Sequence, residues 1–409
     1  MKNILFILFF ATAFTISTYA QPSIQGILQS VKGDERMGMA ISFQNSAKAH
    51  EFRLPYVESI DFRTDWDRMM STRQRFRVRA NLNGFLQNNA EIKRYNALVN
   101  IKTLKLVKEQ KDFLAESYMQ LLDAINVDKN RAISKELLQH YLLLDNVYRK
   151  ALASGTSVDI ADYLKNKERI LVYQSNCIAL SQKRAFRYKC LKLDTSTVIE
   201  TSDLISPEQM KAHLAVLEAN SEHNIENKQL MAELDYLNAK TRLKKAENSK
   251  LIDYVQVGYT VREDLIAENK FTVSLGLTLP YKGTTRVALK ELALNKSELL
   301  AESKISSLNL KDEYIQLMEE FETNFSNYRI INELYLSSDY NRLKESIQFS
   351  GHLSVIEAEE LKKAEIEAKL RQWEYYHELL MCYIKILSLS DVIIELPLRN
   401  YLSDDTPVL

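Results

Sequence analysis

The stretch FTVSLGLTLPYKG, residues 271–283, interrupts a chain whose remaining sequence is mostly typical of helix. Its side chains alternate with period two, which is the pattern of a β-strand. One face carries small polar residues and a glycine, and the other is apolar throughout: Phe271, Val273, Leu275, Leu277, Leu279 and Tyr281. The preceding stretch YVQVGYTV, residues 254–261, alternates in the same way. The sequence therefore predicts a hairpin of two strands over about residues 253–281.

An apolar strand face has two interpretations, because it covers a core in a soluble domain and contacts lipid in an outer-membrane barrel. The second strand is about 11 residues long with aromatic residues near both ends, which suits a tilted transmembrane strand. Helices as long as those on either side leave few other elements to cover the strand. We therefore expect this hairpin to lie in an outer membrane, with lipid against its apolar face.

A weaker pattern of the same kind occurs earlier, over about residues 56–82. Ile60 and Phe62 share a face in the outgoing half, as do Phe76 and Val78 in the returning half. The opposite face is charged and carries Asp61, Arg63, Arg75, Arg77 and Arg79. A barrel tolerates such charges only where they face water, so these residues are expected to line the lumen. Two interpretations stay open, incidental solvated charges and an arginine collar that favours anions.

Two hairpins supply four strands, which is too few to close a barrel. An open sheet edge is not stable in lipid, because its backbone N–H and C=O groups lack partners there. The membrane interpretation therefore requires several copies of the chain.

The rest of the chain is expected to form very long helices. Gly155 is the only glycine between Gly84 and Gly258, and Gly351 is the only one after Gly283. Proline is equally scarce, with 6 in the chain. Since both residues interrupt helices, these stretches permit helices of about 100 Å. One apolar stripe has the helical period and comprises Leu310, Tyr314, Leu317, Phe321, Phe325, Tyr328, Ile331 and Tyr335.

The two halves of the chain resemble each other. ESYMQLL at 116–122 matches DEYIQLM at 312–318, and SGTSV from Ser154 matches SGHLSV from Ser350. The sequence predicts one unit used twice, at 21–205 and 206–390, followed by a C-terminal tail at 391–409. Ser206, Pro207 and Gln209 predict a helix start at the boundary, with Gln209 as the capping-box partner.

Residues 1–20 have the features of a cleaved signal peptide, namely one Lys, an apolar run and small residues at the end. Removing Lys2 from 54 basic residues leaves 53 against 54 acidic ones, a net charge of −1, which argues against nucleic-acid binding. Three cysteines are an odd number, so at least one thiol is unpaired within the chain. Cys177 and Cys190 fall about 20 Å apart on one helix, beyond disulfide reach.

Together the signal peptide, the two strand pairs, SLGLTLPYKG before a long helix and the lone glycines near 155 and 351 resemble the TolC family of outer-membrane efflux proteins. The resemblance implies a mainly α fold with a small β part. Three chains would form a 12-stranded barrel on a periplasmic helical tunnel. The implied function is a passive exit duct of an efflux or type I secretion system. A periplasmic adaptor and an inner-membrane transporter are the implied partners, together with outer-membrane lipid.

The resemblance also assigns individual residues. Gly155 and Gly351 would be the periplasmic helix turns that dock the adaptor, with Ser157, Val158, Leu353, Ser354 and Val355 beside them. Glu357, Asp159 and Asp162 would narrow the tunnel mouth as a gate. The alternative for these three acids is a solvated helix end, since carboxylates in a first turn favour the helix dipole.

Catalytic and metal-binding patterns are missing from the sequence. The 6 histidines show no ligand spacing, and 9 glycines form no phosphate-binding loop. We expect no enzyme activity, no cofactor and no metal. The alternative to a duct is a periplasmic helical-hairpin scaffold or adaptor that does not enter the membrane.

Overall fold

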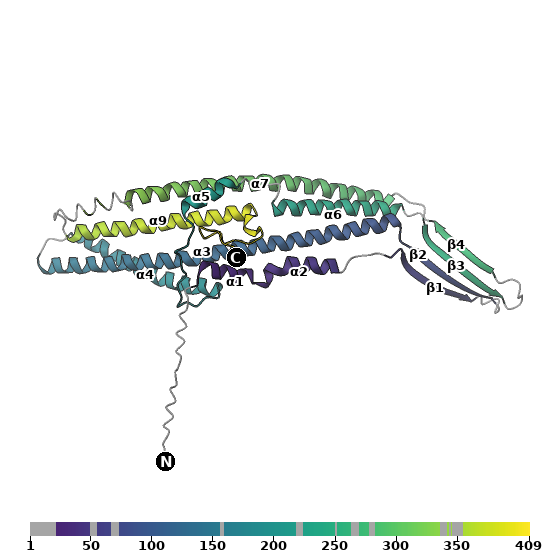
Figure 1. Ribbon diagram of the computed structural model, residues 1–409, viewed down its shortest axis with the longest axis horizontal. Coiled ribbons are helices and arrows are strands. Elements are labelled where there is room, and N and C mark those ends of the chain that lie inside the picture. Colours follow the sequence, from purple (N-terminus) through teal and green to yellow (C-terminus); the bar gives the residue numbers. More distant parts are fainter. Residues whose placement is uncertain are drawn as a thin grey trace, which may run out of the picture.

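The computed structural model of the chain describes residues 22–49, 55–66, 73–155, 159–217, 224–249, 252–262, 270–277, 283–335, 342, 345 and 355–409. The molecule is elongated, with long helices side by side along its length and a small sheet projecting from one end (Figure 1). The proposed signal peptide at 1–20 lies outside the described residues.

The described residues include five long helices, which form the body of the molecule: α3 (Phe85–Ala153), α4 (Ile160–Cys190), α6 (Ile225–Asn248), α7 (Gly283–Tyr335) and α9 (Val355–Leu389). The longest, α3, has 69 residues and spans about 104 Å at 1.5 Å per residue, as the scarcity of glycine predicted. It packs against α4, α6 and α9, and α7 packs against α6 and α9. The end where α3 stops and α9 begins is opposite the sheet (Figure 1).

Short elements surround the middle of the long helices: α1 (Ile24–Lys32), α2 (Glu35–Ala49), α5 (Pro207–Val216) and the 3₁₀ helix η2 (Val392–Ile394). The largest buried apolar cluster lies here and includes the fully buried side chains of Tyr118, Tyr188, Phe321 and Tyr383. The C-terminal tail belongs to it, because Tyr118 Oη donates a hydrogen bond of 2.7 Å to the carbonyl of Arg399. The predicted stripe on α7 is buried at Leu317, Phe321 and Phe325.

Four antiparallel strands form one sheet in the order β1 (Val57–Trp66), β2 (Arg73–Leu82), β3 (Ile252–Arg262) and β4 (Lys270–Leu277). Both hairpins expected from the sequence are present. They join edge to edge, with β2 paired to β3 from Arg73 opposite Arg262 to Asn81 opposite Tyr254. Within the described residues, β1 and β4 are the two unpaired edges.

The helix start predicted at the boundary between the halves is correct, but its capping partner is not. Ser206 is the N-cap of α5 and its side chain accepts from the Gln209 N–H, with Pro207 in the first turn. The Ser206 N–H, however, donates 3.0 Å to Asp404 Oδ1 in the C-terminal tail. The predicted capping box fails because a tertiary contact replaces the local one. The helix α5 ends at Val216, and α6 begins at Ile225.

Cys177, Cys190 and Cys382 are free thiols. Among the described residues, no helix combines the length and the apolar character needed to cross a membrane.

Candidate functional site

The sheet presents one apolar face, assembled by register across all four strands. Successive rows run Ile60–Ala80–Val255–Leu275, Phe62–Val78–Val257–Val273 and Thr64–Phe76–Tyr259–Phe271. Most of this face is open to solvent in the single chain, where Phe62 is 77% and Val273 is 76% exposed. Among the predicted lipid-facing residues, Phe271, Val273, Leu275 and Leu277 lie on it, whereas Leu279 and Tyr281 are outside the described residues.

The apolar face matches the dimensions of a membrane. The 10 residues of β1 and 11 of β3 span roughly 33–36 Å along the strand at ~3.3 Å per residue, which a tilt of about 40° reduces to about 25–28 Å across a membrane. Outer-membrane barrels carry an apolar band of about 25 Å on their outer surface. A monomeric soluble protein rarely exposes a contiguous apolar surface of this extent.

The opposite face of the sheet is polar and carries the predicted arginines. Register places Arg63 opposite Arg77, Asp61 opposite Arg79 and Asp65 opposite Arg75, all on this side. Arg77 forms an ion pair with Asp65 through Nη2. The alternation read from the sequence therefore assigns both faces correctly.

Two glycines allow close packing on the polar face. A Cβ at Gly276 would lie 2.2 Å from Tyr254 Cε1, so the Tyr254 ring covers this glycine. The Arg79 guanidinium stacks on the same ring, 3.9 Å from its centroid. A Cβ at Gly258 would lie 2.6 Å from Thr272 Oγ1. The lack of a side chain at Gly258 therefore leaves room between the Thr272 and Arg77 side chains.

At the opposite end of the molecule, α3 turns toward α4 at Gly155. The φ angle of Gly155 is +73°, a conformation that other residues adopt only with strain, which explains the lone glycine here. Asp159 is the N-cap of α4 and accepts 2.8 Å from the Ala161 N–H, while Asp162 lies in the first turn. The carboxylate of Asp159 thus caps the N-terminus of α4.

Polar contacts tie α9 to α3 near this turn. His140 Nδ1 on α3 lies 2.9 Å from Glu359 Oε2, and Tyr141 Oη donates 3.1 Å to Glu367 Oε1. Between α3 and α4, Lys167 Nζ forms an ion pair of 2.7 Å with the buried Asp145. The three helices are therefore joined by hydrogen-bonded charges as well as by apolar packing.

A cavity of about 300 Å³ lies among these helices and brings together acids that the sequence did not pair. Its lining includes Asp162 from α4, Glu360 from α9 and Tyr148 from α3. Burial raises the pKa of Tyr148, and the carboxylates of Asp162, Glu360 and Asp159 raise it further. Glu360 was missed in the sequence because only the rotation of α9 about its axis decides which acid faces α4.

Two further residues predicted for this end of the molecule lie at the start of α9. Glu357 is exposed in the first turn of α9, and Val355 is the first residue of that helix. Ser157, Val158, Gly351, Leu353 and Ser354 lie outside the described residues.

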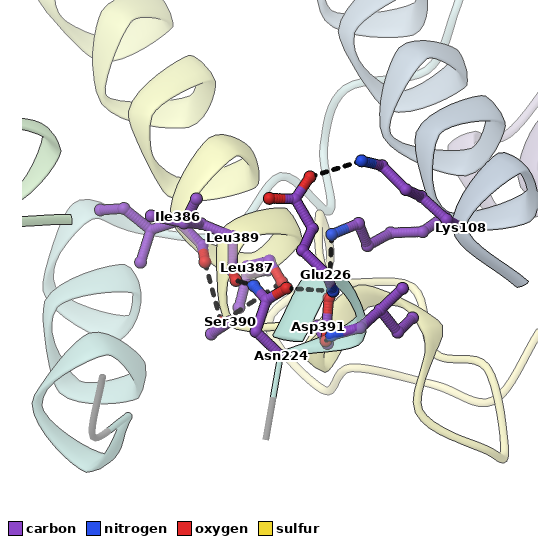
Figure 2. Close-up of polar contacts among 10 residues, drawn as sticks. Lys108, Asn224, Glu226, Ile386, Leu387, Leu389, Ser390 and Asp391 are labelled. Carbon is purple, nitrogen blue, oxygen red and sulfur yellow. Dashed lines mark hydrogen bonds and ion pairs between the residues drawn. The ribbon is translucent and has the colours of Figure 1, made fainter. Parts of the chain in front are cut away.

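A polar joint fixes the start of α6 against the end of α9 (Figure 2). Asn224 is the N-cap of α6, accepting 2.7 Å from the Glu226 N–H, and its Nδ2 donates 2.6 Å to the carbonyl of Leu389. Ser390 continues the end of α9 by donating from Oγ to the carbonyl of Ile386. One amide side chain thus satisfies backbone groups at both helix ends.

Asp391 is the centre of this joint. It adopts a φ of 60°, accepts from the Ile225 N–H, and pairs with Lys111 Nζ at 2.9 Å. The Lys111 and Asp391 side chains are only 7% and 13% exposed. A second pair, Lys108 with Glu226 at 2.6 Å, joins α3 to α6 beside it. The two pairs hold α3, α6 and α9 in one arrangement.

The described residues contain no group of three or more His, Cys, Asp or Glu side chains arranged to hold a metal ion.

The chain is similar to solved outer-membrane channels along most of its length. It superposes on the outer-membrane channel OprN with a TM-score of 0.63 at 12% identity, covering 90% of this chain and 89% of that one. The open-state MtrE channel of Neisseria gonorrhoeae superposes with a TM-score of 0.58 at 9% identity, and the match covers 90% of each chain. The outer-membrane protein VceC of Vibrio cholerae superposes with a TM-score of 0.55 at 10% identity, covering 88% of this chain and 95% of that one.

No protein-family model and no curated protein matches the sequence. The likeness to the solved channels, at such low identity, concerns the fold. It confirms the resemblance that the sequence motifs indicated, because these structural neighbours are TolC-family channels and not enzymes. The chain therefore has the fold of the TolC family of outer-membrane channels.

Proposed function

We propose that this protein is the outer-membrane channel-tunnel of an efflux or secretion system, a passive exit duct whose helices extend into the periplasm. The observation that carries the proposal is the sheet, which has one exposed apolar face, one charged face and two open edges. In a closed barrel, lipid would contact the apolar face and water would contact the charged face. A further copy of the chain would pair with each open edge.

Three copies would close a 12-stranded barrel, with β1 of one chain beside β4 of the next. The lumen would then be lined by Arg63, Arg75, Arg77 and Arg79. Exposed apolar residues on α7 support contact between copies in the helical part as well. Val287, Leu294, Leu308 and Ile315 are 46–68% exposed and fall at multiples of seven residues, the spacing of a coiled-coil seam.

A similar exposed series lies on α4, where Ile160, Leu164, Leu171 and Ile178 are separated by four, seven and seven residues. Each of these side chains is at least 60% exposed in the single chain. Two apolar seams on different helices suit a head-to-tail ring, in which one seam of each copy packs on the other seam of its neighbour.

The helix-turn end would be the periplasmic mouth. Glu357, Asp159 and Asp162 would narrow it as a gate, since like charges from three copies repel one another unless partners or cations approach. Gly155 and Gly351, with Ser157, Val158, Leu353, Ser354 and Val355, would meet the periplasmic adaptor. The adaptor would connect the duct to an inner-membrane transporter that supplies the energy.

Membrane fractionation and mass determination test this function together. We expect the full chain to stay in the outer-membrane fraction after carbonate and high-salt washes. In detergent its light-scattering mass should be that of three chains, and in planar bilayers it should open a conductance. A monomer that is soluble without detergent would overturn the duct and favour a periplasmic scaffold.

A further inference from the structure

The polar face of the sheet carries a large excess of positive charge. Within the paired register, five cationic residues whose side chains the structure describes fall on this face: Arg63, Arg75, Arg77, Arg79 and Lys270. Among those paired and described side chains only Asp61 and Asp65 oppose them, so the excess is five minus two, or +3, per chain. This bias is local, because the whole chain has equal numbers of basic and acidic residues, 54 of each.

Hydrogen bonds and ion pairs within the sheet leave several of these cations unneutralised. Arg77 pairs with Asp65, and Arg79 binds the neutral Gln256 at 3.2 Å. In the described part of the chain, no carboxylate lies within ion-pair distance of Arg75 or Lys270. Both belong to one cross-strand row, in which Arg75 is opposite Thr260 and Thr260 is opposite Lys270.

A groove of about 370 Å³ lies at this row. It is lined by Arg75, Arg77, Gln256, Lys270, Thr272 and Ser274, among others, and Gly258 forms part of its floor. Arg75 and Lys270 are two strands apart, about 10 Å at the usual strand spacing, so both long side chains reach a group bound between them. Guanidinium, ammonium, amide and hydroxyl donors converge, which is the donor set that binds carboxylate, phosphate or sulfate.

We propose that this groove is a binding site for oxyanion groups, and that the duct therefore passes small anionic solutes in preference to cations. The inference rests on the proposed function, because only a closed barrel turns the polar face into a lumen. Three copies would place 3 × 3, or 9, excess cations around one narrow passage. Apolar walls focus such a field, and rings of Arg or Lys select anions in pores.

The cavity at the helix-turn end shows no such excess of charge. Its lining includes three acids, Asp162, Glu360 and Glu367, and three bases, Lys165, Arg169 and Lys363. The positive excess at the sheet therefore has no counterpart in this cavity.

Reversal potentials in a potassium chloride gradient test the proposal on the purified full-length protein. We expect the wild type to be anion-selective, with chloride more permeant than potassium by at least about threefold. Arg75→Gln combined with Lys270→Gln should remove most of that preference. Arg75→Lys with Lys270→Arg keeps both charges and should preserve the preference for chloride. Asp65→Asn removes the ion-pair partner of Arg77 and should increase that preference.

A second measurement uses inorganic phosphate as the probe. Millimolar phosphate on one side should reduce the chloride current of the wild type, and the Arg75→Gln and Lys270→Gln variant should lose this block. If that double variant does not assemble, Lys270→Gln alone, on the edge strand, replaces it in both measurements.

The outcomes separate the two proposals. A wild type that conducts with no preference for chloride, or a neutralised variant as selective as the wild type, overturns the anion site and leaves the duct intact. A wild type that forms no channel at all overturns the duct, and the anion site with it.

Discussion

Single residues explain two features of this molecule that side-chain chemistry alone does not suggest. Apolar and polar side chains alternate along β4, and Gly276 stands at one of the polar positions. It has no side chain there because the Tyr254 ring occupies the space that a side chain would fill. A glycine inside a strand often marks such a close approach, and this was the available sequence signal. Asp391 adopts a left-handed conformation so that its carboxylate meets both Lys111 and the start of α6.

Gly276→Ala should destabilise the sheet. The new Cβ would lie 2.2 Å from Tyr254, so the ring must leave its position and Arg79 loses its stacking partner. We expect a loss of about 1–3 kcal/mol in the free energy of unfolding, measured by denaturation in detergent. Gly38→Ala is the control, because a Cβ there meets nothing within 4 Å and the residue lies in the helix α2. Equal stability of Gly276→Ala and wild type would contradict the close packing.

Asp391→Asn should destabilise the joint between the helices. Asparagine tolerates the left-handed conformation and still accepts from the Ile225 N–H, so the main loss is the charge opposite Lys111. An unpaired buried lysine costs about 3–5 kcal/mol, which should appear as a lower thermal midpoint. Combining the change with Lys111→Met removes the stranded charge and should restore most of the stability. If the double variant is no more stable than Asp391→Asn, the ion pair is not the cause.

At the scale of elements, each strand and helix has a surface that the single chain does not use. The strands expose their apolar face, and the long helices expose the apolar seams on α4 and α7. The period of the side chains decides which residues share such a surface, so the strand faces were predictable. Contacts between helices were not, because His140 with Glu359 and Asp162 with Glu360 depend on how the helices are rotated against one another.

Lysine at two neighbouring positions of β4 distinguishes the two faces of the sheet. Val273 lies on the apolar face and Ser274 on the polar face. A lysine in lipid near the bilayer midplane costs about 2–4 kcal/mol, so Val273→Lys should reduce the fraction of protein inserted in the outer membrane. Ser274→Lys adds the same side chain on the water-facing side and should insert like the wild type. Equal insertion of the two variants would contradict the assignment of the faces.

At the scale of the whole molecule, the proposed function makes this elongated chain one part of a larger closed assembly. Neither edge of the sheet is covered by another described element, and a long body of helices continues away from it (Figure 1). Assembly would supply the missing neighbours at the edges of the sheet and along the helical seams. The internal repeat and its boundaries at 21–205 and 206–390 stay predictions, although both halves contain two strands followed by two long helices.

Leu294→Asp with Leu308→Asp should disrupt assembly. Both leucines lie on the exposed seam of α7, and losing the burial of one leucine costs about 1.5–3 kcal/mol before the charge is counted. Two such losses at each interface correspond to at least about a 100-fold weaker association. Light scattering in detergent should therefore report species smaller than three chains. The control is Asn295→Asp with Asn309→Asp, which adds the same charge one residue further along and should assemble normally. If this control also gives species smaller than three chains, the added charge rather than the loss of the seam disrupts the assembly.

The sequence by itself determined the classes of element, the great length of α3 and the two faces of each strand. These are local properties, because alternation, glycine spacing and apolar period are written in neighbouring residues. Gly155 at the turn, Ser206 at the helix start and the arginines on the polar face follow from them.

Only the tertiary structure decided which of these elements meet. β2 pairs with β3 although they belong to different halves of the chain, and Asp404 from the C-terminal tail replaces Gln209 at the Ser206 cap. The groove between Arg75 and Lys270 has the same origin, since it needs three strands in register. Such contacts depend on packing between distant segments, and a local period carries no information about the partner.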